Sequence, residues 1–459
     1  MNCNAVKIIE MTDTHRQFDT VIVGMGKTGY SCARYLSGQG INFAMTDNRA
    51  EPPMLDEIRR EFLHVPLYTG GFDPELLSGA RELLVSPGVS LQEPAIVHAI
   101  KNGVSVCGDI ELFCRNAAAP IIAITGSNGK STVTTLIAEM IRDAGLKVGV
   151  GGNLGTPALD LLQESGIDFY VLELSSFQLE SVSSLNAVVS AVLNVTEDHM
   201  DRYASMQEYI IAKSRIYDGE GTMIINLDDP LVAAMQRNGR KIIEFTLSEP
   251  AGEHYGVRIY ENERWLVKGN DKLLSASEIR IAGDHNIANA LATLAIGEVI
   301  NLPRESMFKV LRTFPGLPHR CEWIAEADGI RWINDSKGTN VGASVAAIKG
   351  LANQKNIVLI AGGDGKGADF SPLAQIAKDY MRAAVLIGRD AALIRKVLQD
   401  IVPLENAHDM ESAVNAAAGL AQEGDVVLLS PACASLDMYQ DYRVRGDAFR
   451  SAVLKRVGG

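Results

Sequence analysis

Short apolar runs and longer segments with helical periodicity alternate along most of the chain. The apolar runs begin at Thr20–Val23 and recur near residues 43, 82, 104, 121, 169 and 188, and then near 330, 357, 384 and 426. Helix-like periodicity is clearest over Thr132–Ala144 and Asn286–Val299. This alternation is typical of α/β proteins with mainly parallel sheets. We therefore predict an α/β fold in three blocks, residues 1–108, 109–316 and 317–459, with residues 1–16 as a flexible tail.

The pattern changes within the second block. From Met223 to Ile281 the chain shows alternating β-type segments such as 257–260 and 265–267, which predict a small antiparallel appendage. Pro315–Pro318, with Gly316 between them, predicts a linker to the third block.

Composition narrows the class of protein. The 459 residues correspond to about three domains by length, and the net charge of −13 argues against general nucleic-acid binding. The six cysteines form no C-x-x-C pair, so we expect reduced, mostly buried thiols. The sequence shows neither a signal pattern nor an apolar run of membrane-spanning length, so we expect a cytoplasmic protein that does not bind membranes. We also expect a monomer.

The most informative segment is a glycine turn with a lysine, Gly126-Ser127-Asn128-Gly129-Lys130-Ser131-Thr132. It follows the apolar run at 121–124 and precedes a helix-like segment, the arrangement that holds nucleotide phosphates. Lys130 would contact the outer phosphates, and a hydroxyl of Ser131 or Thr132 would serve Mg²⁺. The spacing is shorter than in the usual P-loop; the alternative is a plain turn with a solvated lysine.

A second glycine turn, Gly24–Gly29, lies in the first block between a strand and a helix, and Asp47 ends the next strand. Alone, it suggests a Rossmann-type dinucleotide site. Together with the lysine turn, it suggests a pyrophosphate on the first turn and a triphosphate on the second. The alternative is a tight turn without a ligand.

Candidate metal and acid–base residues follow strands of the second block. Glu173 ends one strand, and His199 lies in the polar segment 194–201 after another. A carboxylate at such a strand end can hold Mg²⁺. Lys213 lies among apolar residues of a predicted helix, and the residues alone favour a surface lysine. Asn289 lies near a helix start, where capping competes with nucleotide contact.

The third block carries polar turns after several strands. They contain Asp335 with Lys337, the glycine turn ending at Lys366, and Ser435, and Arg320 in the linker adds a cation. Since the carboxyl ends of parallel strands meet at one edge, these turns predict a ligand site. Ordinary turn chemistry is the alternative.

Taken in order, these motifs resemble the Mur ligase family from about Thr20 to the C-terminus. The segments that carry the resemblance are 126–132, LELSSFQL (172–179), NVTEDHMDR (194–202), LPHR (317–320), WINDSK (332–337), GGDGK (362–366) and LSPACASLD (429–437). The family implies three domains: a Rossmann-like domain for a UDP-sugar, a central P-loop-type ATPase domain, and a Rossmann-like domain for an amino acid.

The resemblance also implies residue roles. For the UDP-sugar these are Lys27, Thr28, Asp47, Arg49, Gly88, Asn153 and His199. For ATP they are Gly126, Ser127, Asn128, Gly129, Lys130, Ser131, Thr132, Asn289, Arg320, Asp335 and Lys337. For D-glutamate they are Thr339, Lys366, Ser435 and Tyr442, the last being Phe in most of the family. The implied metal ligands are Ser131, Glu173, His199 and Lys213, with Lys213 N-carboxylated to a carbamate; the implied catalytic residues are Lys130, Glu173, His199 and Lys213.

The resemblance implies the branch of the family that adds D-glutamate to UDP-N-acetylmuramoyl-L-alanine in peptidoglycan synthesis, with ATP and two Mg²⁺ ions. Alternatives are another Mur-type or folylpolyglutamate-type ligase. Outside this fold, the alternatives are a dinucleotide-dependent oxidoreductase, against which the phosphate turn at Gly126 argues strongly, and a non-enzymatic nucleotide-binding switch.

Overall fold

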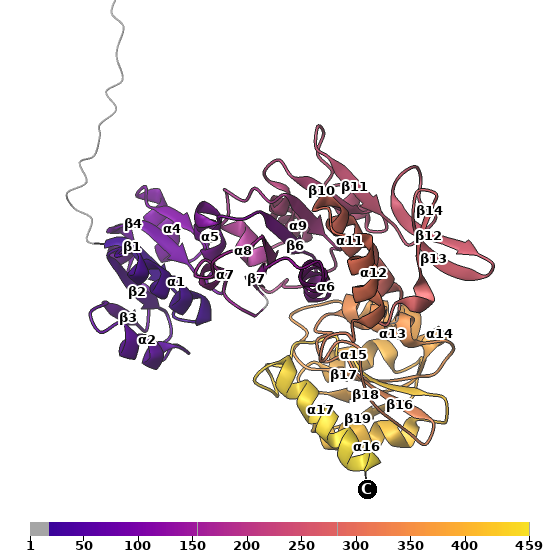
Figure 1. The fold of residues 1–459 in the computed structure, drawn as a ribbon. Coiled ribbons are helices and arrows are strands. Elements are labelled where there is room, and N and C mark those ends of the chain that lie inside the picture. Colours follow the sequence, from indigo (N-terminus) through magenta and orange to yellow (C-terminus); the bar gives the residue numbers. More distant parts are fainter. Residues whose placement is uncertain (1–17, 154, 282, 459) are drawn as a thin grey trace, which may run out of the picture. The chain divides into compact units, whose positions relative to one another are not determined.

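The computed structural model describes residues 18–153, 155–281 and 283–458, which form two compact units (Figure 1). The first unit holds the chain up to Ala118 together with Gly151–Ser165 and Phe177–Leu185. The second unit holds the remainder. The proposed tail, residues 1–16, lies outside the described residues.

The sheet of the first unit is wholly parallel, and its strand order places β1 at the centre. The order is β3 (Leu67–Thr69), β2 (Phe43–Asp47), β1 (Phe18–Val23), β4 (Ala80–Val85) and β5 (Ser105–Cys107). The helices of this unit are α1 (Lys27–Gly38), α2 (Leu55–Glu61), α3 (Pro74–Ser78), α4 (Pro94–Lys101), α5 (Asp109–Asn116), α7 (Ala158–Leu161) and most of α8 (Ser176–Glu180). The strand order reverses between β1 and β4, which creates the crevice where such sheets bind ligands.

The central sheet is mixed. Its parallel part comprises β7 (Val148–Gly152), β8 (Phe169–Glu173), β6 (Ile121–Thr125), β9 (Val189–Val192), β10 (Thr222–Asn226) and β11 (Ile242–Phe245), followed by β12 (Tyr255–Tyr260), β13 (Glu263–Lys268) and β14 (Asp271–Ser275). The helices are α6 (Lys130–Asp143), α9 (Met206–Ser214), α10 (Pro230–Ala233), α11 (Asp284–Val299) and α12 (Arg304–Thr313), with 3₁₀ turns at Arg215–Tyr217 and Ala276–Glu278. Apolar residues of α6, α11 and α12 build one continuous core with this sheet.

The expected extent of the antiparallel appendage is wrong at its start. β10 pairs parallel with β9 and with β11, and antiparallel pairing begins only between β12 and β13. The appendage is therefore the β12–β14 meander.

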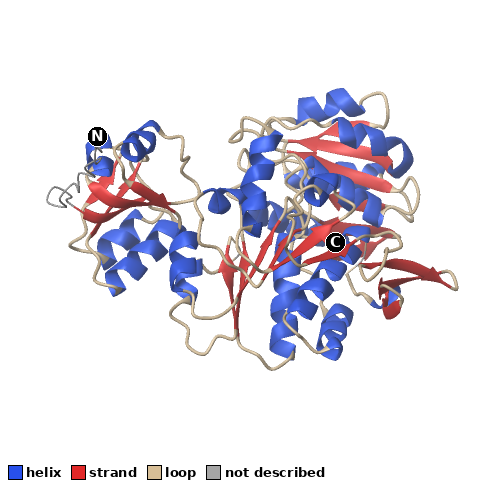
Figure 2. Cartoon of the chain, turned by 90° about the horizontal axis from the view of Figure 1, so that it is seen from above, coloured by secondary structure: helices blue, strands red, loops and turns tan. Residues whose placement is uncertain are grey.

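The third sheet belongs to the same unit as the central sheet. Its order is β15 (Glu322–Ala327), β16 (Ile330–Asn334), β20 (Val426–Leu429), β17 (Ile357–Gly362), β18 (Met381–Ile387) and β19 (Leu404–Asn406), with only β15 antiparallel. Helices cover both faces (Figure 2): α13 (Val341–Leu351), α14 (Ser371–Tyr380) and α15 (Ala391–Leu398) build one core, and α16 (Met410–Leu420) and α17 (Tyr442–Val457) the other.

Two further findings concern membrane-spanning helices and cysteines. Among the described helices, every one is too short or too polar to cross a lipid bilayer. Within the described chain the five cysteines are free thiols, and Cys32, Cys107 and Cys433 are buried. Cys3 lies outside the described residues.

Candidate active site

The lysine turn joins β6 to α6 and has a backbone that depends on glycine. Gly129, just before the helix, has φ 82°, and a Cβ there would lie 2.5 Å from the Asn289 side-chain oxygen. Asn194 fixes the other half of the turn: its backbone oxygen accepts from Ser127 N at 2.9 Å, and its side chain accepts from Asn128 N at 2.8 Å. Because those two amides are occupied, the first-turn amides of α6 are the donors left for phosphate.

Two ammonium groups, one half-buried and one buried, converge on one carbonyl of this turn. The Lys130 Nζ donates to Gly126 O at 2.8 Å and to Ser127 O at 3.0 Å, and the Lys213 Nζ donates to Gly126 O at 3.0 Å. Burial lowers the pKa of Lys130, and burial together with the Lys130 charge holds the pKa of Lys213 well below its ordinary value. Lys213 is only 2% exposed, so the interpretation from the residues alone, a surface lysine, is wrong.

Glu173 ends β8 and His199 follows β9, the two strands that flank β6 in the central sheet. Glu173, at the end of β8, is buried. His199 follows β9, has φ 58°, and has its pKa lowered to about 4, first by burial, so the imidazole is neutral at pH 7. Burial disfavours the charge on Asp198, but His199 and Lys366 together still hold its pKa at about 2.

Side chains of the third domain reach the central domain at the lysine turn and at Asp198. The guanidinium of Arg320, which precedes β15, donates to Ser131 Oγ at 2.6 Å. Lys366 forms an ion pair with Asp198, and the Asn340 amide donates to the same carboxylate at 3.2 Å. These contacts connect the third domain with the central one.

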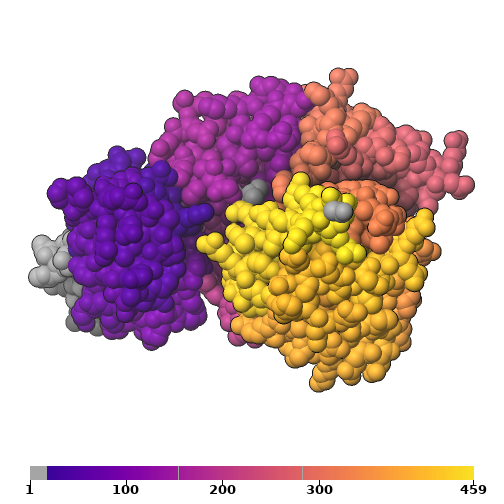
Figure 3. Space-filling model, turned by 90° about the horizontal axis from the view of Figure 1, so that it is seen from below, coloured from indigo at the N-terminus to yellow at the C-terminus, as the bar shows by residue number. Residues whose placement is uncertain are grey.

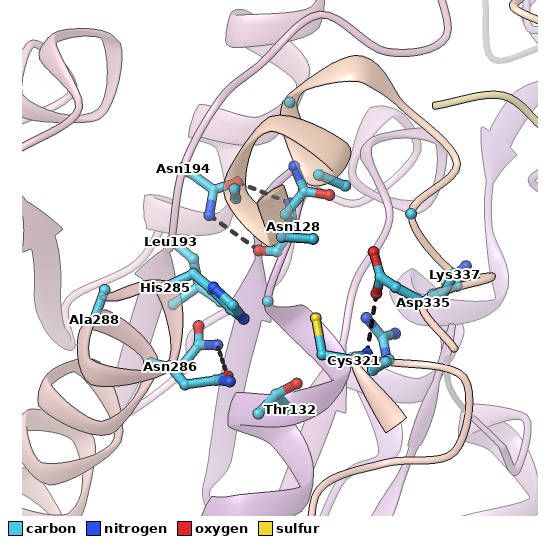
Figure 4. A pocket seen from close by; sticks show the side chains of 18 of the residues that line it. Asn128, Thr132, Leu193, Asn194, His285, Asn286, Ala288, Cys321, Asp335 and Lys337 are labelled. Carbon is cyan, nitrogen blue, oxygen red and sulfur yellow. Dashed lines mark hydrogen bonds between the residues drawn. The ribbon is translucent and has the colours of Figure 1, made fainter. Parts of the chain in front are cut away.

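A cavity of about 280 Å³ lies beside the lysine turn and Arg320 (Figure 4); of the described residues, Lys130, Glu173, His199 and Lys213 do not line it. Of the residues proposed for ATP, those lining it are Asn128, Gly129, Thr132, Asn289, Arg320, Asp335 and Lys337. Burial raises the pKa of the Asp335 carboxyl to about 6, and its oxygens accept from Ser430 Oγ at 2.7 Å and Cys321 N at 3.2 Å. Burial, with the nearby Arg320 charge, lowers the pKa of Lys337 to about 8.

Asn289 has no capping role. α11 begins at Asp284 with Gly283 before it, and Asn289 lies inside the helix, where its amide donates to Asn286 Oδ1 at 3.2 Å. His285 and Phe245 also line the cavity. Phe245 ends β11 and His285 lies in the first turn of α11, but neither belongs to a glycine–lysine turn, so their places could not be predicted from sequence.

The residues proposed for D-glutamate lie in the third domain. Thr339, Lys366 and Ser435 lie in the loops that follow β16, β17 and β20, respectively. Tyr442 is the first residue of α17. Ser435 is buried, and Lys366 is occupied by Asp198. Their role in amino-acid binding stays a prediction.

The first unit contains the other glycine turn at the reversal of its sheet. The Asp47 carboxylate accepts from Met25 N at 2.7 Å and from the Arg49 guanidinium at 2.8 and 2.7 Å. Asp47 therefore fastens the glycine turn to Arg49. Thr28 and Lys27 begin α1, Gly88 follows β4, and Asn153 follows β7; their contacts with a UDP-sugar stay predictions, as does that of His199 in the second unit.

Comparison with known proteins identifies related domains along the chain. Three family models match: the MurD-like N-terminal domain of Mur ligases over residues 18–108, the Mur ligase middle domain over 124–297 and the Mur ligase glutamate ligase domain over 319–433. The UDP-N-acetylmuramoylalanine–D-glutamate ligase of Nitrosococcus oceani is 54% identical over 95% of this chain and 96% of its own. The enzyme of that name from Marinobacter nauticus is 53% identical over 95% of this chain and 97% of its own.

A solved structure shows the same fold. The UDP-N-acetylmuramate-alanine ligase MurC from Thermotoga maritima aligns with 96% of this chain and 100% of its own at a TM-score of 0.58 and 17% identity. Together with the identity to the two relatives over nearly the whole chain, the three domain matches show that this chain belongs to the Mur ligase family.

Proposed function

We propose that this chain is an ATP-dependent ligase that joins D-glutamate to the L-alanyl carboxylate of UDP-N-acetylmuramoyl-L-alanine, a step of peptidoglycan synthesis. The observation that carries the proposal is the 54% identity, over 95% of the chain, to an enzyme with that name. The cavity beside a lysine-bearing phosphate turn supports the use of ATP.

The reaction has two steps, a phosphoryl transfer and an acyl transfer. An oxygen of the L-alanyl carboxylate attacks the γ-phosphorus of ATP; the bond between this phosphorus and the β,γ-bridging oxygen breaks, and ADP leaves with its electron pair. The neutral amine of D-glutamate then attacks the acyl carbon; the bond from this carbon to the phosphorylated oxygen breaks, phosphate leaves with that oxygen, and the new amide nitrogen loses one proton to water. Such transfers depend on positioning and charge neutralisation more than on covalent catalysis.

The residues of the turn suit the first step. The amides of the first α6 turn would bind the phosphates, with Lys130 held at the same turn, and Arg320 reaches this turn through Ser131. The neutral His199 imidazole can accept a hydrogen bond without adding positive charge.

The residues also fit Mg²⁺ when phosphates are present. Among the described residues no group of three or more His, Cys, Asp and Glu converges as a metal site. Mg²⁺ usually binds through one or two carboxylates plus substrate phosphates and water, so buried Glu173 and the Ser131 hydroxyl suffice as protein ligands with His199 nearby. Bound there, Mg²⁺ would neutralise phosphate charge.

A carbamate on Lys213 would convert the second lysine into an oxygen ligand. An amine must be neutral to attack CO₂, after which it loses a proton and leaves a carbamate anion. The buried Lys213, with its strongly lowered pKa, meets that requirement. The change would also replace one of the two cations on Gly126 O by an anion beside Lys130.

Product analysis tests the proposal. Incubation with UDP-N-acetylmuramoyl-L-alanine, ATP, Mg²⁺ and D-glutamate should give a nucleotide product heavier by one glutamyl residue, with one ADP formed per product. Formation of ADP without that product would refute the proposed activity.

A further inference from the structure

Lys337 is one of the residues that line the nucleotide cavity, and its ammonium group lies against an aromatic ring. Its Nζ lies 4.4 Å from the ring centroid of Tyr442. Within residues 18–153, 155–281 and 283–458, this ammonium makes no hydrogen bond or ion pair. The carboxylate of Asp335, two residues earlier, is instead bonded to Ser430 and Cys321.

An aromatic face differs from a carboxylate as a partner for a cation. A ring attracts a desolvated ammonium through the negative charge on its face, yet it carries no net charge and accepts no proton. Lys337 faces Arg320 and Lys130, which disfavour its charge, and Glu173 and Asp198, which favour it. The ring therefore offsets part of the cost of burial while leaving the full positive charge for a phosphate in the cavity.

Hydrogen bonds link the turn that carries Lys337 to the start of α17, which carries Tyr442. The Ser336 hydroxyl donates to the carbonyl of Tyr442 at 2.7 Å. The buried Arg445 guanidinium donates to Ser336 O at 2.8 Å, to Ser336 Oγ at 3.0 Å and to Cys433 O at 3.1 Å. Asp441 caps α17 by accepting from Arg443 N at 2.7 Å.

The other side of the ring is also fixed. The His319 ring meets Tyr442 edge to face, with centroids 6.1 Å apart. The rest of α17 lies along the surface of the third domain, as the yellow segment in Figure 3 shows, and Leu454 on this helix is 48% exposed. Tyr442 is thus held by the turn that carries Lys337 and by the linker histidine.

We propose that Tyr442 is a positioning residue whose ring holds the Lys337 ammonium toward the phosphates in the nucleotide cavity. This role differs from the amino-acid contact that the family resemblance implies for Tyr442, and it rests on the proposed ligase function. The hydroxyl is not needed for it, so Phe should serve equally.

A matched pair of rings tests the proposal. Tyr442→Phe keeps the negative face, whereas Tyr442→pentafluorophenylalanine keeps the shape and removes the attraction for a cation. We expect the fluorinated variant to lower kcat about tenfold relative to Tyr442→Phe, to weaken ATP binding measured without amino acid, and to shift the alkaline limb of the pH–kcat profile to lower pH. Leu454→Ala, on the exposed side of α17, controls for damage to the helix.

Two outcomes would overturn the proposal. One is equal kcat, ATP affinity and alkaline limb in the two ring variants. The other is a change confined to KM for D-glutamate, which would make Tyr442 an amino-acid contact. The wild-type turnover with D-glutamate tests the ligase function separately, and ATP binding reports on Lys337 whether or not that turnover occurs.

Discussion

At the scale of single residues, the site brings together charged side chains that are far apart in the sequence. Lys130 belongs to a recognisable turn, but Lys213 lies 83 positions later and reaches the same carbonyl. Local pattern favours a surface position for Lys213, because its neighbours show no clear helical stripe. Only the packing of α9 against the turn buries it. Asn194 likewise bonds to the turn from a loop that is distant in sequence, and the local sequence of the turn does not predict this contact.

Lys130→Ala should abolish most ATP-dependent turnover. The lysine is the cation fixed inside the phosphate turn, and losing one preorganised donor costs about 10²–10³-fold in rate. Steady-state ADP formation measures the loss. Near-normal rates would remove the phosphate turn from the mechanism.

Lys213→Ala should be inactive alone and partly restored by short carboxylic acids such as acetate. The acid would supply the anionic oxygen that a carbamate provides, in the space left by the buried side chain. The same acids should not restore Lys130→Ala, which serves as the control. Full activity of Lys213→Ala without added acid would reject the carbamate.

At the scale of elements, the sequence predicts strands and helices well but not strand direction. The apolar runs at 222–226 and 242–245 were expected in the antiparallel appendage, yet they are parallel strands. A short apolar run has the same pattern in either direction, and direction is set by the crossover connections. Edge strands such as β15 could not be predicted, because their residues are partly exposed on both faces and show no clear alternation of apolar and polar side chains.

The turn between β1 and α1 makes an element-scale prediction. A Cβ on Gly29 would lie 1.9 Å from Gly24 O, so Gly29→Ala should push α1 from the sheet and destabilise the first unit by about 3 kcal/mol. Thermal unfolding measures this effect. Gly38→Ala, in the same helix with open space around its Cβ, should stabilise slightly. Equal behaviour of the two variants would show that the close approach has no energetic consequence.

The start of α5 makes a pH-dependent prediction. Burial raises the pKa of Asp109 to about 6, and one of its oxygens, Oδ1, has no partner among the described residues. Below the ordinary value of 3.8 the group is protonated in both the folded and the unfolded state, so its contribution to stability is lost as pH rises through about 6. The cost reaches about 3 kcal/mol, at 1.36 kcal/mol per pKa unit.

Asp109→Asn should therefore raise Tm at pH 8 by roughly 2–4 °C per kcal/mol recovered, and leave Tm unchanged near pH 4. The exposed Asp56, changed to Asn in the first turn of α2, controls for loss of a helix-terminal charge. The same Tm difference at both pH values would contradict the account of Asp109.

At the scale of the whole molecule, the three-domain Mur ligase architecture predicted from the motifs is confirmed by the family matches. The boundaries at 108/109 and 316/317 stay predictions. Residues 151–165 and 177–185 pack with the first unit although they are distant from it in sequence, which a linear division of the chain could not reveal. Arg34 and Ser31 of α1 bind Asp160 within that unit.

The D-glutamate specificity also belongs to this scale, because we propose that the third domain selects the amino acid. The most direct test measures phosphate release with UDP-N-acetylmuramoyl-L-alanine, ATP and a panel of amino acids. We predict release with D-glutamate and none above background with L-glutamate, L-lysine or meso-diaminopimelate. Release with L-lysine or meso-diaminopimelate, but not with D-glutamate, would contradict the account.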